Sequence, residues 1–195
     1  HWTVTGATLT TDQFGNTNSA YDFSWANQYI TLPDTAIPLT FPITISCIAR
    51  PDAVPAWATN DTIVHIWTRA TNQAYWLAFW GVTQGQKIMI YAWAQLNVYS
   101  DAIYNLGQVY HITLTIDTGW VTSLFIDWVR QVSTQTYPSL VPTGTLRELW
   151  RLWLNDWYAL DWGIYKFSVW NRILTDSEIM MNYKATSGNM SLTKW

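Results

Sequence analysis

Short segments in which apolar and polar residues alternate run through most of this chain, separated by turn residues. The segments are rich in Thr, Val, Ile, Tyr and Trp, the residue types enriched in β-strands. Alternation with a period of two predicts strands that bury one face. The pattern predicts strands at 20–24, 28–32, 42–50, 62–68, 74–80, 86–92, 95–99, 109–116, 121–126, 129–135 and 163–170.

One stretch alone has the pattern of a helix. Thr175 is a typical N-cap residue, and Glu178 follows three positions later, before the apolar residues of 179–183. Strands and helices do not alternate along the chain, which argues against a parallel sheet. We therefore expect an all-β, antiparallel two-sheet sandwich with one short C-terminal helical turn.

The clearest local feature is a hairpin around Asp127 and Trp128. Two alternating segments, 121–126 and 129–135, meet across these two residues. A two-residue hairpin turn needs positive φ at both positions, which is why Asp-Gly and Asn-Gly are the usual pairs. Trp in the second position is conformationally costly where Gly is not.

Composition excludes several classes of partner. Charged residues make up 12% of the chain, the net charge is −3, and the ten Lys and Arg residues are dispersed. Without a basic stripe, neither nucleic acid nor an anionic membrane surface is an expected partner. No apolar run approaches the roughly 18 residues of a membrane span. The single cysteine, Cys47, lies in an apolar run and is expected to be a buried core residue with no disulfide partner.

Five segments in order resemble the laminin-G-like, concanavalin A-type jelly-roll family. They are SAYDFSWANQYI at 19–30, TISCIARPDA at 44–53, YHITLTID at 110–117, LFIDW at 124–128 and FSVWNRILTDSEI at 167–179. The resemblance implies a concanavalin A-like jelly-roll sandwich formed by a single domain over 1–195. The family has a further strand just before the first of these segments. Because the chain begins at His1, we expect a piece of a longer protein that lacks this first strand.

The fifteen tryptophans have three interpretations. Some, such as Trp76 and Trp170, are expected in the core. Others could form platforms for sugar rings, because an aromatic ring has an apolar body and, in Trp, a polar tip. The stretch 149–157 predicts such a ligand-binding surface, formed by Trp150, Trp153, Trp157 and Asn155.

The third interpretation concerns tryptophans that stand where a tight turn or the family pattern favours glycine. They are Trp2, Trp25, Trp120, Trp128, Trp157 and Trp162. Some bacterial lineages and their viruses read the codon UGA as glycine, whereas a common alternative code reads it as tryptophan. We hypothesise that several of these residues are glycines in the natural protein.

No catalytic constellation is visible. Retaining glycosidases need two carboxylates about 5–5.5 Å apart, and the glucanase relatives of the fold supply them from one strand. This chain has two glutamates, Glu148 and Glu178, which are far apart in the sequence. It also lacks a G-x-S-x-G elbow and a His/Cys cluster with metal-ligand spacing. The chain is therefore not expected to be an enzyme.

Calcium is the one cofactor for which the sequence offers candidate ligands. Hard oxygen ligands on loops bind calcium, and relatives of the fold carry such an ion at the rim of the sandwich. The candidate ligands are Asp22, Asn27, Asp156 and Asp161. Against this site, the family's closing strand begins with two acids, whereas this chain has Ile164-Tyr165-Lys166.

Two function classes follow. The first is a non-catalytic recognition module that binds a glycan or a surface protein, at the surface of a cell or particle. The second is a structural or assembly domain of an extracellular filament, fibre or virus particle. Low charge and many aromatic residues suit a large protein contact.

Overall fold

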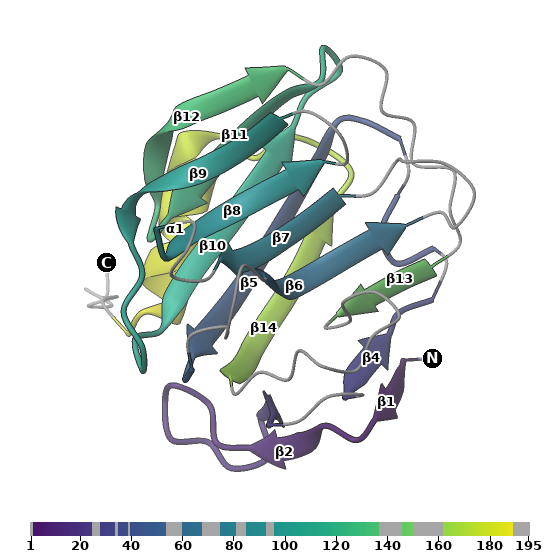
Figure 1. The fold of residues 1–195 in the computed structure, drawn as a ribbon, viewed down its shortest axis with the longest axis vertical. Coiled ribbons are helices and arrows are strands. Elements are labelled where there is room, and N and C mark those ends of the chain that lie inside the picture. The colour runs from purple at the N-terminus through teal and green to yellow at the C-terminus, as the bar shows by residue number, and fades with distance from the viewer. Residues whose placement is uncertain are drawn as a thin grey trace, which may run out of the picture.

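The computed structural model describes residues 2–24, 28–33, 35–38, 40–53, 60–67, 75–80, 85–92, 96–136, 146–149 and 162–188. In this part of the chain two seven-stranded antiparallel sheets form a jelly-roll sandwich (Figure 1). One helix lies against the outer face of the second sheet. The predicted fold class is confirmed.

The first sheet has the strand order β1 (Thr3–Thr5), β4 (Tyr29–Thr31), β13 (Leu146–Leu149), β6 (Asn60–Trp67), β7 (Tyr75–Trp80), β8 (Lys87–Ala92) and β9 (Leu96–Ile103). The second sheet has the order β12 (Val129–Thr136), β11 (Val121–Ile126), β10 (Tyr110–Ile116), β5 (Ile43–Pro51), β14 (Trp162–Trp170), β3 (Ala20–Phe23) and β2 (Thr8–Thr10). Each strand predicted from the alternation has its counterpart among these. The strands β1, β2 and β13 were not predicted.

The core lies between the two sheets, and β5 shows how the sequence builds it. Ile45, Cys47 and Ala49 point inward and are at most 1% exposed. Cys47 is therefore the buried core residue that its apolar surroundings predicted, and burial raises the pKa of its thiol. Thr44 and Ser46 alternate with these residues and point to the outer face of the second sheet.

That outer face is covered by α1 (Asp176–Thr186) and by the segment that leads into it. The Thr44 hydroxyl donates to the carbonyl of Arg172 at 2.7 Å and accepts from the amide of Leu174 at 3.0 Å. Leu174 and Ile179 form a second small apolar cluster with Phe125 of β11. The helix therefore makes the sandwich three layers thick at this point.

The start of α1 is the capping box that the sequence predicted. The Thr175 hydroxyl accepts from the amide of Glu178, and the Glu178 carboxylate accepts from the amide of Thr175. Hydrogen bonds from Arg172 and from Thr175 lower the pKa of Glu178 to about 2. The helix has 11 residues, so it is longer than the single turn that was expected. Among the described residues no helix is long and apolar enough to cross a bilayer.

The predicted hairpin is present, with Ile126 paired to Val129 across the turn. Asp127 has φ of 49° and Trp128 has φ of 65°. Trp120, in the turn between β10 and β11, has φ of 68°. Both tryptophans thus occupy the left-handed region that favours glycine.

The remaining tryptophans of the glycine hypothesis behave differently. Trp162 lies within β14, and Trp2 precedes β1 with 55% of its surface exposed. Trp25 and Trp157 lie outside the described residues. Trp170, expected in the core, packs partly buried against the small cluster under α1, while the side chain of Trp76 is outside the described part.

Candidate ligand-binding site

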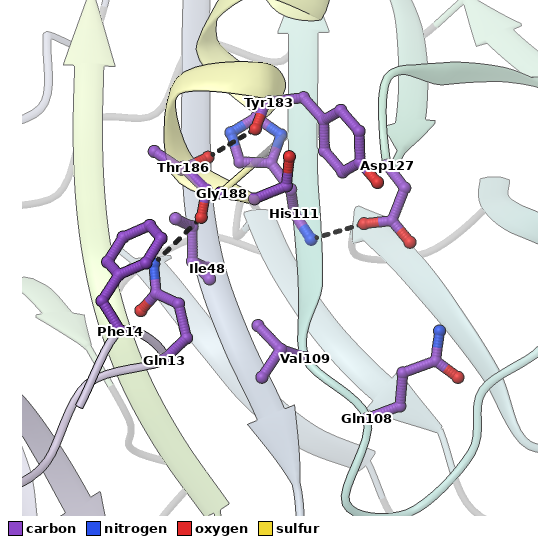
Figure 2. Close-up of a pocket in the computed structure, with 11 residues that line it drawn as sticks. Gln13, Phe14, Ile48, Gln108, Val109, His111, Asp127, Tyr183, Thr186 and Gly188 are labelled. Carbon is purple, nitrogen blue, oxygen red and sulfur yellow. Dashed lines mark hydrogen bonds between the residues drawn. The ribbon is translucent and has the colours of Figure 1, made fainter. Parts of the chain in front are cut away.

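A cavity of about 480 Å³ opens where the C-terminal end of α1 meets the outer face of the second sheet (Figure 2). We call it the helix pocket. Its lining comes from the loop after β2, from β5, from β10 and the loop before it, from the β11–β12 turn, and from the end of α1. Figure 2 shows Gln13 and Phe14 on one side of the pocket, and Asp127 and Gln108 on the other.

The loop after β2 is held in a defined shape by Asp12. Its carboxylate accepts hydrogen bonds from the amides of Phe14 and Asn16, both at 2.9 Å. This arrangement fixes Gln13 so that its Nε2 donates to the carbonyl of Thr186 at the end of α1, at 3.3 Å. Phe14, 51% exposed, places an aromatic ring at the mouth of the pocket.

His111 forms part of the pocket wall and is 6% exposed. Its Nε2 lies 3.2 Å from the Ser46 hydroxyl, to which the Thr113 hydroxyl donates at 3.1 Å. Its Nδ1 is buried and has no hydrogen-bond partner among the described residues. The ring meets Tyr183 of α1 edge to face, with the ring centroids 6.0 Å apart.

The electrostatic state of His111 follows from this burial. Desolvation, and to a smaller extent the charge of Lys166, lower its pKa to about 4. His111 is therefore neutral at physiological pH and adds no positive charge to the pocket.

Asp127 is the only acidic residue among the described residues that line the pocket. Its Oδ1 accepts a hydrogen bond from the amide of His111 at 2.9 Å, and its own amide donates to the carbonyl of His111 at 2.8 Å. Burial raises the pKa of the Asp127 carboxyl, although the bond from His111 opposes this rise. The hairpin turn thus fixes a partly buried carboxylate at the edge of the pocket.

A second cavity of about 420 Å³ shares Gln108 and Asp127 with the helix pocket. We call it the hairpin pocket, because it lies between the end of β9 and the start of β12. Gln131 lines this pocket, donating to the carbonyl of Val129 at 2.8 Å and accepting from the amide of Asp101 at 2.7 Å.

Several side chains that line the hairpin pocket make hydrogen bonds within the protein. The Tyr110 hydroxyl accepts from the amide of Asn105 at 2.6 Å, and Asn105 Nδ2 donates to Gln108 Oε1 at 3.2 Å. The Gln108 Nε2 group makes no hydrogen bond to a described residue, so it is available to a ligand. Preorganisation of this kind lowers the entropic cost of binding.

The ligand-binding residues that the sequence predicted, Trp150, Trp153, Trp157 and Asn155, lie outside the described residues, so that prediction stays untested. The pocket residues found instead were not predicted. Asp127 and His111 were visible in the sequence only as a turn residue and as part of a strand. No local pattern links them to Gln13, which lies about a hundred positions away.

The predicted calcium ligands are also largely outside the described part of the chain. Asn27, Asp156 and Asp161 lie outside the described residues, and Asp22 lies on β3. The negative charge of Asp22 contributes to the raised pKa of Arg50, which is hydrogen bonded to Asp52 at 2.8 Å. A cation therefore already lies near Asp22. Within the described residues no group of His, Cys, Asp and Glu side chains could hold a metal ion.

The Ser–His pair beside the pocket does not have the geometry of a catalytic triad. Ser46 and His111 form a Ser–His pair, but Asp127 contacts the backbone amide of His111 and not its ring. A triad needs the acid on the second ring nitrogen. Ser46 is 5% exposed and does not line the pocket, so no substrate reaches its hydroxyl.

Comparison with protein families gives one match. The model of the concanavalin A-like lectin/glucanases superfamily matches residues 24–180. None of the curated proteins compared with the chain matches it.

Solved structures with the same fold come from larger proteins. A Trypanosoma rangeli sialidase in complex with sialic acid superposes with a TM-score of 0.70 and 14% identity, over 97% of this chain and 30% of that one. A botulinum neurotoxin type G receptor binding domain gives a TM-score of 0.69 and 13% identity, over 95% of this chain and 46% of that one. The chain thus spans less than half of either protein, and the likeness is one of fold.

Proposed function

We propose that this chain, which belongs to the concanavalin A-like lectin/glucanases superfamily, is a non-catalytic recognition module that binds carbohydrate at the junction of the helix pocket and the hairpin pocket. It would act outside the cell, at a cell or particle surface, as lectin-like domains typically do. The two neighbouring folds belong to a sialidase and to a toxin receptor-binding domain. They support recognition as the function class, while the site itself rests on this chain's own residues.

The observation that supports this proposal is the mixed lining of two adjoining cavities. Phe14 and Tyr183 offer apolar ring faces, while Gln108 and Asp127 offer a donor and an acceptor of hydrogen bonds. Sugars combine apolar faces with hydroxyl groups, and sites for such amphipathic ligands have this composition. In the described lining of the helix pocket, Asp127 is a partly buried carboxylate without an acidic neighbour, and the Asp101 carboxylate of the hairpin pocket accepts from the amide of Val132. This arrangement fits binding better than glycoside hydrolysis.

A glycan array followed by titration calorimetry tests the proposal. We expect specific glycans to bind, and expect Gln108→Ala and Phe14→Ala to weaken that binding about tenfold each, as loss of one directed contact does. Leu9→Ala is the matched control for Phe14, because Leu9 is similarly exposed, at 53%, and does not line the pocket. Binding that is unchanged in both pocket variants would place the ligand elsewhere.

An assembly function is the second candidate, and one surface feature favours it. Ile103 at the end of β9 and Val129 on β12 are 58% and 52% exposed, and both border the hairpin pocket. Val132, further along β12, is 86% exposed. Apolar residues grouped at a sheet edge suit a protein contact. Defined oligomers on a sizing column, abolished by Val132→Lys and without glycan binding, would favour assembly over recognition.

A further inference from the structure

The carboxylate of Asp127 has an unusual position among the described residues, because it lies at the junction of two cavities without a cationic partner. Its Oδ1 is bonded to the amide of His111, while its Oδ2 accepts no hydrogen bond from a described residue. No Lys or Arg stands among the described residues that line either pocket. His111, which also lines the helix pocket, is neutral.

Other carboxylates in the described part of the chain show the contrast. Asp52, whose side chain is 21% exposed, is compensated by Arg50, whose Nε donates to both carboxylate oxygens and whose Nη2 donates to Oδ2. Glu178 is compensated by Arg172 and by the helix cap. A partly buried charge with no counter-charge costs stability. Its presence in a cavity is explained if a ligand supplies the missing donors.

We propose that the junction of the two pockets selects glycans that bring hydroxyl or amino donors to Asp127, and that it rejects glycans bearing a carboxylate. This inference rests on the proposed recognition function and adds the charge class of its ligand. Amino sugars and neutral sugars belong to the favoured class. Sialylated and uronic-acid glycans belong to the rejected class.

Gln108 adds a hydrogen-bond donor to the acceptor that Asp127 provides for the glycan. Its Nε2 can donate into the same junction at which the Asp127 carboxylate accepts. A sugar hydroxyl both accepts and donates a hydrogen bond, so it can satisfy both residues at once. A ligand carboxylate can accept from Gln108, but it has no proton for Asp127, and two like charges about 4 Å apart repel by about 1 kcal/mol even in bulk water, or about fivefold in affinity.

The test is an array that carries neutral-hexose, amino-sugar, sialylated and uronic-acid glycans, followed by titration of the best neutral glycan and its uronic-acid analogue. For the wild-type protein we expect the dissociation constant of the acidic analogue to be at least about tenfold higher, because the partly buried site screens charge less than water does. Asp127→Asn removes the charge while Asn tolerates the left-handed backbone of this turn. In this variant we expect the acidic and neutral analogues to bind equally.

Asp117→Asn is the matched control. Asp117 is also a turn aspartate, whose carboxylate accepts from the amides of Gly119 and Val121 at 2.8 and 2.9 Å, and it lines neither pocket. We expect this variant to retain the discrimination of the wild type. If the acidic analogue binds wild type as tightly as the neutral one, or if discrimination persists in Asp127→Asn, the inference is wrong while recognition stands. If no glycan of any class binds, both proposals are wrong.

Discussion

The positive φ of Trp128 makes a quantitative prediction about the hairpin. A non-glycine residue in the left-handed region costs about 1–2 kcal/mol relative to its usual conformation. Glycine avoids this cost but loses about 0.4–1 kcal/mol through the greater freedom of the unfolded chain. For Trp128, with φ of 65°, the balance favours glycine over alanine by about 0.5–1 kcal/mol.

The comparison of Trp128→Gly with Trp128→Ala isolates this backbone effect. Trp128 is 45% exposed, so both variants lose the same partly buried indole and that loss cancels. Val132 is the matched control, because it lies on β12, the strand that follows the turn, is 86% exposed and has no left-handed backbone. At Val132 alanine should be more stable than glycine by about 0.5–1 kcal/mol, so the sign reverses between the two sites.

Urea denaturation of the four variants measures the effect as a shift in midpoint at constant slope. If glycine is the less stable residue at both sites, the left-handed conformation of Trp128 is wrong. The same φ bears on the hypothesis that Trp128 and Trp120 are glycines in the natural protein. Intact-mass measurement of protein from its natural source decides that question, because each Trp-to-Gly difference changes the mass by a fixed amount.

Three further predictions concern stability. The folded pKa of His111, about 4, lies below its unfolded value of 6.5, so the unfolded state binds a proton first as the pH falls. About 3 kcal/mol of stability should therefore be lost between pH 6.5 and 4. In urea titrations across this range His111→Gln should show a flatter pH profile than wild type, and an unchanged profile would contradict a neutral buried imidazole. Thr175→Ala should cost about 1 kcal/mol by opening the capping box, and Thr175→Ser, which keeps the hydroxyl, should recover most of it in the same assay. Gly163→Ala places a methyl group 3.2 Å from the Tyr165 ring and should lower the free energy of unfolding by about 1 kcal/mol or more. In a Tyr165→Ala background the same change should cost little. Equal costs in both backgrounds would show that the ring is not the obstacle.

The strands were predictable because their period-two alternation is long enough to stand out, as it is over the nine residues of β5. The strands β1, β2 and β13 have three or four residues each, too few for a period to be recognised. They are defined by their pairing in the sheets, β1 with β4, β2 with β3, and β13 with β4 and β6. The Asp127 hairpin and the Thr175 cap were predictable for a different reason, since each depends on residues within three positions of one another.

The helix pocket was not predictable, because it depends on contacts between segments that are remote in sequence. Gln13 and Thr186, which join across its rim, are 173 positions apart. The alternation of β10 predicts that His111 and Thr113 face solvent, yet both are at least 94% buried, because α1 covers the outer face of the sheet. Alternation identifies the face that packs against the partner sheet, but it does not reveal a third layer on the other face.

Asp127 shows a further limit of sequence reasoning. An aspartate in a two-residue turn is fully explained by its tolerance of the left-handed backbone, so the sequence gives no reason to seek a second role. Only the structure shows that Oδ1 accepts from the amide of His111 while the side chain lines two cavities whose described lining contains no Lys or Arg. A role in the turn alone requires neither that the Asp127 carboxylate be partly buried nor that it lie without a cationic neighbour. The same residue therefore satisfies the local rule and leaves an electrostatic cost that a ligand with hydrogen-bond donors would offset.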